Sequence, residues 1–151
     1  MNIRNNPERG ASAVEMAMVA PFLLLVLLGI IEFGFVFGQF NEIRHATREG
    51  ARYAAVSNPD LDGGGIGNSD VIEAVCSSLN LSGATVEINA SWTGTGSIGD
   101  QAEIEVIVDI ESLSGAPIIS SFVPDDLSNV ATFRLEQDAK WSTIANTNAC
   151  P

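Results

Sequence analysis

The sequence feature that most constrains this chain is a long apolar run near its N-terminus. From Met16 to Phe40, only Glu32 and Gln39 are strongly polar among 25 residues. About 20 apolar residues in a helix cross the ~30 Å hydrocarbon core of a bilayer. A helix in a soluble protein is rarely apolar on all sides for so long. The run therefore predicts one membrane-spanning helix, with the span at about residues 16–37.

A short polar leader, residues 1–10, precedes this run, and Glu15 lies at the start of the run. An acidic side chain at mid-span costs roughly 2.5–3.5 kcal/mol, so Glu15 needs a partner or a position at the membrane edge. If the chain is cut after Gly10, the new amino group of Ala11 lies one helical turn from Glu15, at the spacing of facing neighbours. The new positive charge would neutralise the carboxylate, within one chain or between two.

The same residues resemble a known family. Gly10, followed at a spacing of five by Glu15, is similar to the cleavage motif of type IVb prepilins. The longer segments 9–25, 31–34 and 48–55 resemble the TadE-like family, whose members are minor pilins or pseudopilins of the tight-adherence (Tad) pilus machinery. Met16 stands where many relatives carry Phe or Tyr, and we expect little effect on cleavage. The resemblance is detailed from Arg9 to about Val56 and covers the rest only in outline.

The resemblance implies a subunit that is processed and then assembled. A prepilin peptidase would cut between Gly10 and Ala11, and Glu15 would set the register by seeking a terminal amine. The implied partners are that peptidase, other pilin or pseudopilin subunits, Tad assembly proteins and the inner membrane. The implied role is assembly or priming of a pilus used in adhesion. A minor rather than a major subunit is expected, because major subunits of this class are much shorter.

Charge is distributed unevenly along the chain. Residues 1–56 hold five acids and five arginines, whereas residues 57–151 carry the whole net charge of −12. We expect no nucleic-acid partner for so acidic a head, because phosphates repel carboxylates. Counting arginines on the two sides of the span leaves the orientation ambiguous. The short leader, the large acidic part after the span and the prepilin resemblance favour a cytoplasmic N-terminus and a head in the periplasm or outside.

The helix is expected to continue beyond the membrane as an amphipathic stalk to residue 56, packed against the following domain. Pro21 should bend the span locally. Gly34 and Gly38 permit close approach of another helix, although such a spacing also arises by chance. Glu32 has two interpretations, a carboxylate near the outer interface that reaches water and a carboxylate that contacts another subunit.

The rest of the chain predicts a breaker-rich loop over 57–69 and a small head over 70–151. A short helix is expected over 70–80, capped by Ser69. Period-two alternation predicts three strands at about 86–92, 102–110 and 131–141, with a hairpin turn over 93–100. The fold class is therefore α+β, a long N-terminal helix packed on a small three-stranded antiparallel sheet with one short helix. The apolar connection over 112–129 is either tucked under the sheet or exposed for a partner.

Cys76 and Cys150 are the only cysteines. An even pair in an exported domain predicts a disulfide, and two unpaired thiols are the alternative. The closed loop of about 75 residues would contribute roughly 4 kcal/mol in the chain-entropy model.

Sites for catalysis are missing from the sequence. His45 is the only histidine, and no metal-ligand cluster, catalytic triad or nucleotide signature is present. We therefore expect no enzyme, no cofactor and no metal. The main alternative function is a single-pass anchored binding domain that does not polymerise. An anchored enzyme, a pseudopilin of a type II secretion apparatus and an ordinary secretory signal are weaker alternatives, and the apolar run is longer than the usual signal.

Overall fold

A single long helix, α1 (Pro7–Ala55), dominates the computed structural model, which describes residues 7–56, 67–80, 84–110, 113, 121–147 and 149–150. Its 49 residues correspond to about 73 Å at 1.5 Å per residue. Pro21 lies inside this helix, which continues through it. Most of the expected leader (1–10) and of the expected loop (57–69) lies outside the described residues.

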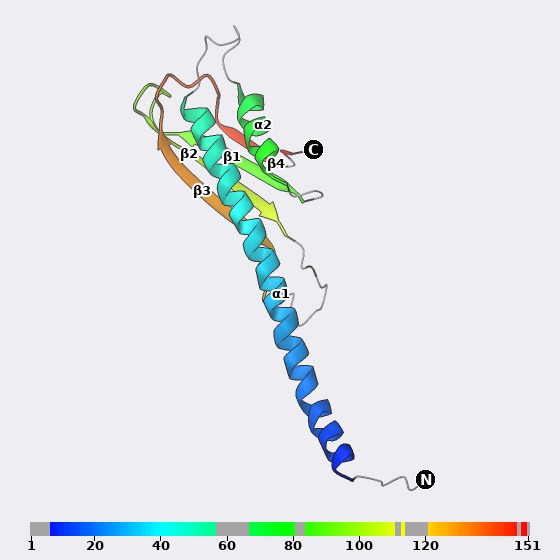
Figure 1. The fold of residues 1–151 in the computed structure, drawn as a ribbon. Helices are drawn as coiled ribbons and strands as arrows, with labels where there is room; N and C mark the ends of the chain where they lie inside the picture. Colours follow the sequence, from blue (N-terminus) through cyan, green and yellow to red (C-terminus); the bar gives the residue numbers. More distant parts are fainter. Residues whose placement is uncertain are drawn as a thin grey trace.

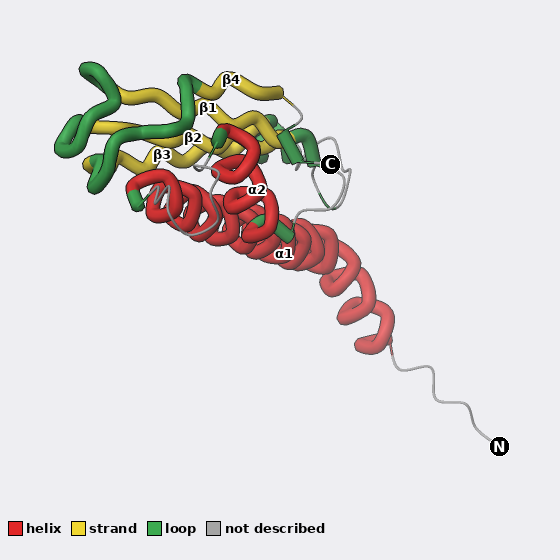
Figure 2. Tube along the Cα trace, turned by 90° about the horizontal axis from the view of Figure 1, so that it is seen from above, coloured by secondary structure: helices red, strands yellow, loops and turns green. Residues whose placement is uncertain are grey.

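The head packs along the C-terminal part of α1, and the N-terminal part extends away from it (Figure 1). The head consists of helix α2 (Asn68–Ser78) and strands β1 (Val86–Trp92), β2 (Gln101–Asp109), β3 (Asp126–Arg134) and β4 (Ile144–Thr147). The strands form one antiparallel sheet in the order β3-β2-β1-β4. Viewed from above, both helices lie on one side of this sheet, so the molecule has two layers (Figure 2).

The predicted α+β class is confirmed, but the prediction of three strands is wrong. The third strand covers Asp126–Arg134 and does not continue to Trp141. The alternation misled because Ala139 and Trp141 also pack on the core, from a segment that follows the strand. The fourth strand, β4, pairs with β1. Its four residues are too few for a period-two pattern to stand out in the sequence.

The core lies between the sheet and the two helices. The inward residues of β1 and β2 meet in register, with Ile88 opposite Val106 and Ala90 opposite Ile104. Each of these four side chains is at most 2% exposed. The alternation predicted for the first two strands is thus present, with one face of the sheet buried on helices and the other facing solvent.

Helix α2 begins two residues earlier than expected, and its cap differs from the prediction. The residue before the helix is Gly67, not Ser69, and it offers no side chain. The Asp70 carboxylate instead accepts a hydrogen bond from the Gly67 backbone N–H (Oδ2···N 2.7 Å). The Asp70 carboxylate thereby provides an acceptor for one of the otherwise unsatisfied backbone N–H groups at the helix start. Its negative charge also suits the positive end of the helix dipole.

Two parts of α1 have different surroundings. In residues 10–31, here called the uncovered half, no side chain is buried. In residues 32–55, the covered half, one side of the helix packs on α2, β2 and β3. The buried residues of this half are Glu32, Ile43, Ala46, Thr47, Gly50, Ala51, Ala54 and Ala55. The head is therefore the packing partner that the amphipathic stalk required.

Candidate functional site

The uncovered half of α1 presents apolar side chains in every direction. Phe22 is 75% exposed, Leu25 51% and Ile30 65%. An 18-residue stretch of α1 has a mean hydropathy of 2.5, and α1 is the one described helix that is long and apolar enough to cross a membrane. Because the described part of the chain does not cover this apolar surface, we expect lipid or other apolar helices to cover it.

The residues of the predicted processing site lie near the start of α1. Gly10, Ala11 and Glu15 are all in helical conformation and all exposed. A Cβ placed on Gly10 would meet no heavy atom within 4 Å. Ala11 and Glu15 are four residues apart in an unbroken helix, which places them on the same face one turn apart. The helical spacing assumed for the amine and the carboxylate is therefore present.

Glu32 is held by its own chain. The side chain is only 1% exposed, and its Oε1 accepts a hydrogen bond from the backbone N–H of Leu113 at 2.6 Å. Leu113 belongs to the connection between β2 and β3, 81 residues further along the chain. Neither interpretation of Glu32 from the sequence included this contact. A carboxylate inside an apolar segment needs such a donor, because burial without one costs several kcal/mol, on the order of the desolvation penalty of a charge.

Gly34 and Gly38 line a groove of about 480 Å³ where the head meets α1, together with Phe35, Gln39, Glu42, Asn80 and Ala84. A Cβ on either glycine would meet no heavy atom within 4 Å. Two oxygens here, Gln39 Oε1 and Glu42 Oε2, are buried and have no hydrogen-bond partner among the described residues. The groove therefore offers close approach beside the two glycines, whereas these two oxygens lie beneath its surface.

The exposed side of the covered half is basic. Arg44, His45, Arg48 and Arg52 are all exposed. The Arg44 guanidinium lies 5.7 Å from the centre of the Phe40 ring, within the range of a cation–π contact. His45 lies on this side as a surface residue.

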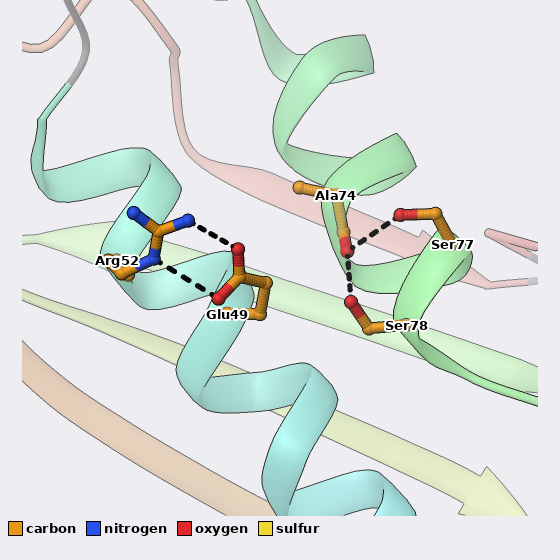
Figure 3. A network of polar contacts seen from close by, with 5 residues as sticks. All are labelled: Glu49, Arg52, Ala74, Ser77 and Ser78. Atoms are coloured by element: carbon orange, nitrogen blue, oxygen red, sulfur yellow. Dashed lines mark hydrogen bonds and ion pairs between the residues drawn. The ribbon is translucent and has the colours of Figure 1, made fainter.

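One arginine of this side pairs with an acid one turn away. Arg52 donates two hydrogen bonds to the Glu49 carboxylate, one of them from Nε to Oε2 at 3.1 Å (Figure 3). Hydrogen bonding by Arg52 lowers the pKa of Glu49 below its ordinary value, and the same contact raises the pKa of Arg52. The Arg52 and Glu49 side chains keep 69% and 36% of their surface exposed, so we expect the pair to add little to stability.

The pair also lines a shallow groove of about 400 Å³ between α1 and α2, with Tyr53, Asp70 and Glu73 among its other residues. On the α2 side, the Ser77 and Ser78 hydroxyls both donate to the Ala74 carbonyl (Figure 3). Among the described residues, no group of three His, Cys, Asp or Glu side chains is placed to hold a metal ion.

The structure contains a disulfide between Cys76 of α2 and Cys150 near the C-terminus, with a Cα–Cα distance of 5.4 Å. The link closes a loop with a sequence separation of 74 residues. It joins the segment after β4 to α2, so the C-terminal end of the head is covalently attached to the helix layer. In the chain-entropy model such a loop contributes roughly 4 kcal/mol.

A family of known proteins matches the N-terminal helix of this chain. The family model for TadE, described as "TadE-like protein", matches residues 10–52. The matched segment begins at Gly10 and ends near the C-terminus of α1, so the resemblance to the TadE-like family is confirmed for this helix. It indicates a protein related to the Tad pilus system, with an N-terminal helix able to span a membrane. No curated protein and no solved structure matches the chain.

Proposed function

We propose that this chain is a minor pilin or pseudopilin that acts in assembly or priming of a Tad pilus. The observation that carries the proposal is the unbroken helix over the residues that match the TadE-like family, with its N-terminal half apolar and exposed all round. Such a helix can lie in lipid as a single-pass anchor or in contact with like helices, because both environments bury the same apolar surface.

Processing is the second step of the proposal. A prepilin peptidase cuts after Gly10, and the Ala11 amino group becomes the positive end of the mature helix. Glu15, one turn further on, is then positioned to receive such an amine from its own chain or from a neighbour. In an apolar surrounding this charge pairing is strong, and an unpaired Glu15 is costly. The pairing therefore sets the axial register of neighbouring helices.

The groove beside Gly34 and Gly38 supports lateral packing. The two glycines let another helix approach closely, and Gln39 and Glu42 present buried acceptors. On the other side of the same helix, Arg44 and Arg48 are exposed donors. A neighbouring subunit that brings an arginine to the groove would meet the negative charge of Glu42, whose side chain is only partly buried. The role is thus structural, in the inner membrane with the head outside the cytoplasm or in the pilus, and neither catalysis nor a cofactor is part of it.

Replacing Glu15 tests the register step. We expect Glu15→Gln to leave membrane insertion unchanged, because the substitution lowers the polarity of the span, and to reduce the amount of assembled pilus by at least about tenfold, the equivalent of roughly 1.4 kcal/mol per contact. Glu49→Gln is the matched control, since Glu49 lies in the same helix but pairs locally with Arg52. Pilus is measured in the sheared fraction and insertion by membrane fractionation.

N-terminal mass spectrometry of the membrane-bound protein tests processing. A start at Ala11 supports the proposal. A start at Met1, with a monomeric protein, would favour the anchored binding domain instead. Normal pilus levels with Glu15→Gln would reject the register role while leaving the family relationship intact.

A further inference from the structure

The end of the sheet nearest the uncovered half of α1 is formed by the last residues of β2 and the first residues of β3. The Ile110 N–H donates to the Asp125 carbonyl at 3.0 Å, which closes this end of the sheet. In Figure 1 the beginning of β3 lies beside the middle of α1, below the rest of the head. This end of the head is therefore the part that comes closest to a membrane crossed by α1.

The contact between Glu32 and Leu113 fixes the height of this end along the helix. Glu32 lies inside the apolar segment, between Ile31 and Phe33, whose side chains are 48% and 57% exposed. A backbone group of the head reaches the helix at this level, at 2.6 Å from Glu32 Oε1. Glu32 is five residues before the outer end of the span predicted over 16–37, or about 8 Å along the helix. When the apolar segment is in a bilayer, Leu113 consequently lies near the outer boundary of the hydrocarbon.

Two large apolar side chains of the β2–β3 connection are exposed. Leu113 is 57% exposed and Phe122 72%. The residue after Phe122, Val123, packs against the core, so the position of Phe122 is anchored by its neighbour. Aliphatic and aromatic side chains at the depth of the interface leave water for lipid at a gain in free energy.

We propose that this end of the head rests on the outer leaflet and inserts Leu113 and Phe122 into a zwitterionic lipid interface. The occupant is lipid rather than another protein, because Leu113 lies at the level of Glu32 and Phe122 belongs to the same end of the head, so both continue the apolar surface of the span. Three exposed acids, Asp109, Asp125 and Asp126, lie at the same end. They disfavour anionic headgroups, so the contact is apolar and not electrostatic. It depends only on α1 spanning the membrane, not on the pilin role.

The opposite end of the sheet offers a matched control. Ile98, in the turn between β1 and β2, is 68% exposed, almost as much as Phe122. This turn is tied to the far end of α1, since Gly99 bonds to Leu135 and the next residue, Glu136, bonds to Ala55. Ala55 is 23 positions beyond Glu32, or about 35 Å along the helix. Ile98 should therefore remain in water.

The experiment measures depth by electron paramagnetic resonance on the full-length chain, one copy per phosphatidylcholine nanodisc. Nitroxides are attached to Leu113→Cys, Phe122→Cys or Ile98→Cys, with the native disulfide left intact. We expect the ratio of oxygen to nickel-complex accessibility to be several-fold higher at positions 113 and 122 than at 98. Replacing half of the lipid with phosphatidylglycerol should lower the ratio at position 122.

Equal, water-like ratios at all three positions would overturn the proposal. So would low accessibility to both reagents at position 122, which would mean that protein and not lipid covers it. A deeper label in anionic lipid would also contradict the apolar contact. If Leu113→Cys fails to fold, Phe122→Cys alone decides, because the Phe122 side chain is exposed. Cleavage at Gly10 is unaffected by any of these results, so the two proposals fail separately.

Discussion

The two halves of α1 belong to one uninterrupted helix but are stabilised in different ways. In the uncovered half, Leu25 leaves 51% of its surface exposed, whereas Ile43 in the covered half is fully buried. The covered half has small residues on its inner side, such as Ala46 and Ala54, which let the sheet and α2 approach. The uncovered half has large apolar residues on all sides. The difference shows which surface the chain covers itself and which it leaves for lipid or other subunits.

The largest test of the comparison is to cut the link between the head and the covered half. Trp141 is 1% exposed, and its Nε1–H donates to the Ala54 carbonyl at 3.3 Å. We expect Trp141→Ala to lower the free energy of unfolding of the head by about 3–5 kcal/mol. Thermal unfolding in detergent micelles, followed by circular dichroism, measures this. Lys140→Ala, at an exposed neighbour, should change stability by less than about 0.5 kcal/mol. If Trp141→Ala changed stability as little as Lys140→Ala, the contact of Trp141 with α1 would be unimportant.

A smaller test compares glycines of the two halves. A Cβ on Gly50 would overlap the Cγ2 atom of Val75 in α2, whereas a Cβ on Gly29 would meet nothing within 4 Å. We expect Gly50→Ala to destabilise the head by about 1–3 kcal/mol through overpacking. Gly29→Ala should be neutral or stabilise the helix by up to about 1 kcal/mol. Chemical denaturation of both variants measures these changes in stability. A neutral Gly50→Ala would mean that α1 and α2 have room between them for an additional methyl group.

The smallest expected effect concerns pH. Arg52 lowers the pKa of Glu49 from its ordinary value of 4.5, so the pair stabilises the folded chain above that pH. Its contribution is lost as pH falls through the lowered pKa of Glu49. The small stability difference between the wild type and Arg52→Gln should therefore vanish in acid and shrink with salt.

An NMR titration of the Glu49 carboxyl in micelles checks the cause directly. Its midpoint should rise in Arg52→Gln and stay unchanged in Arg48→Gln, since Arg48 is also exposed on the same helix but does not pair with Glu49 in the structure. An ordinary midpoint in the wild type would contradict the pairing.

The elements with a regular pattern could be predicted from the sequence. The long helix followed from the apolar run and its amphipathic continuation, and β1 and β2 followed from strict alternation. The end of β3 was misplaced because Trp141 continues the alternation without being in the strand. In β4, Ile144 is the one buried residue among the three whose side chains are described. Local patterns indicate which side chains are buried. They do not indicate which segments pair with one another through hydrogen bonds.

The candidate site shows the same limit. The matched helix and the spacing from Ala11 to Glu15 are local features and were accessible from the sequence. The contact of Glu32 with Leu113 joins residues 81 positions apart. The groove that contains Gln39 and Glu42 forms only when the head packs beside α1. Such contacts depend on how the chain is folded back, and neither composition nor periodicity encodes that.

The sharing of one helix between the head and the membrane has a practical consequence. A water-soluble version of the head cannot be obtained by removing α1 as a whole, since Ile43 and Ala54 complete the interior beneath the sheet. A shortened protein must begin near Glu32, which accepts the hydrogen bond from Leu113, to keep its fold, and it must omit the apolar residues before it. For the same reason, a force that pulls on the uncovered half of α1 would act directly on the folded head, because the helix continues unbroken from one to the other.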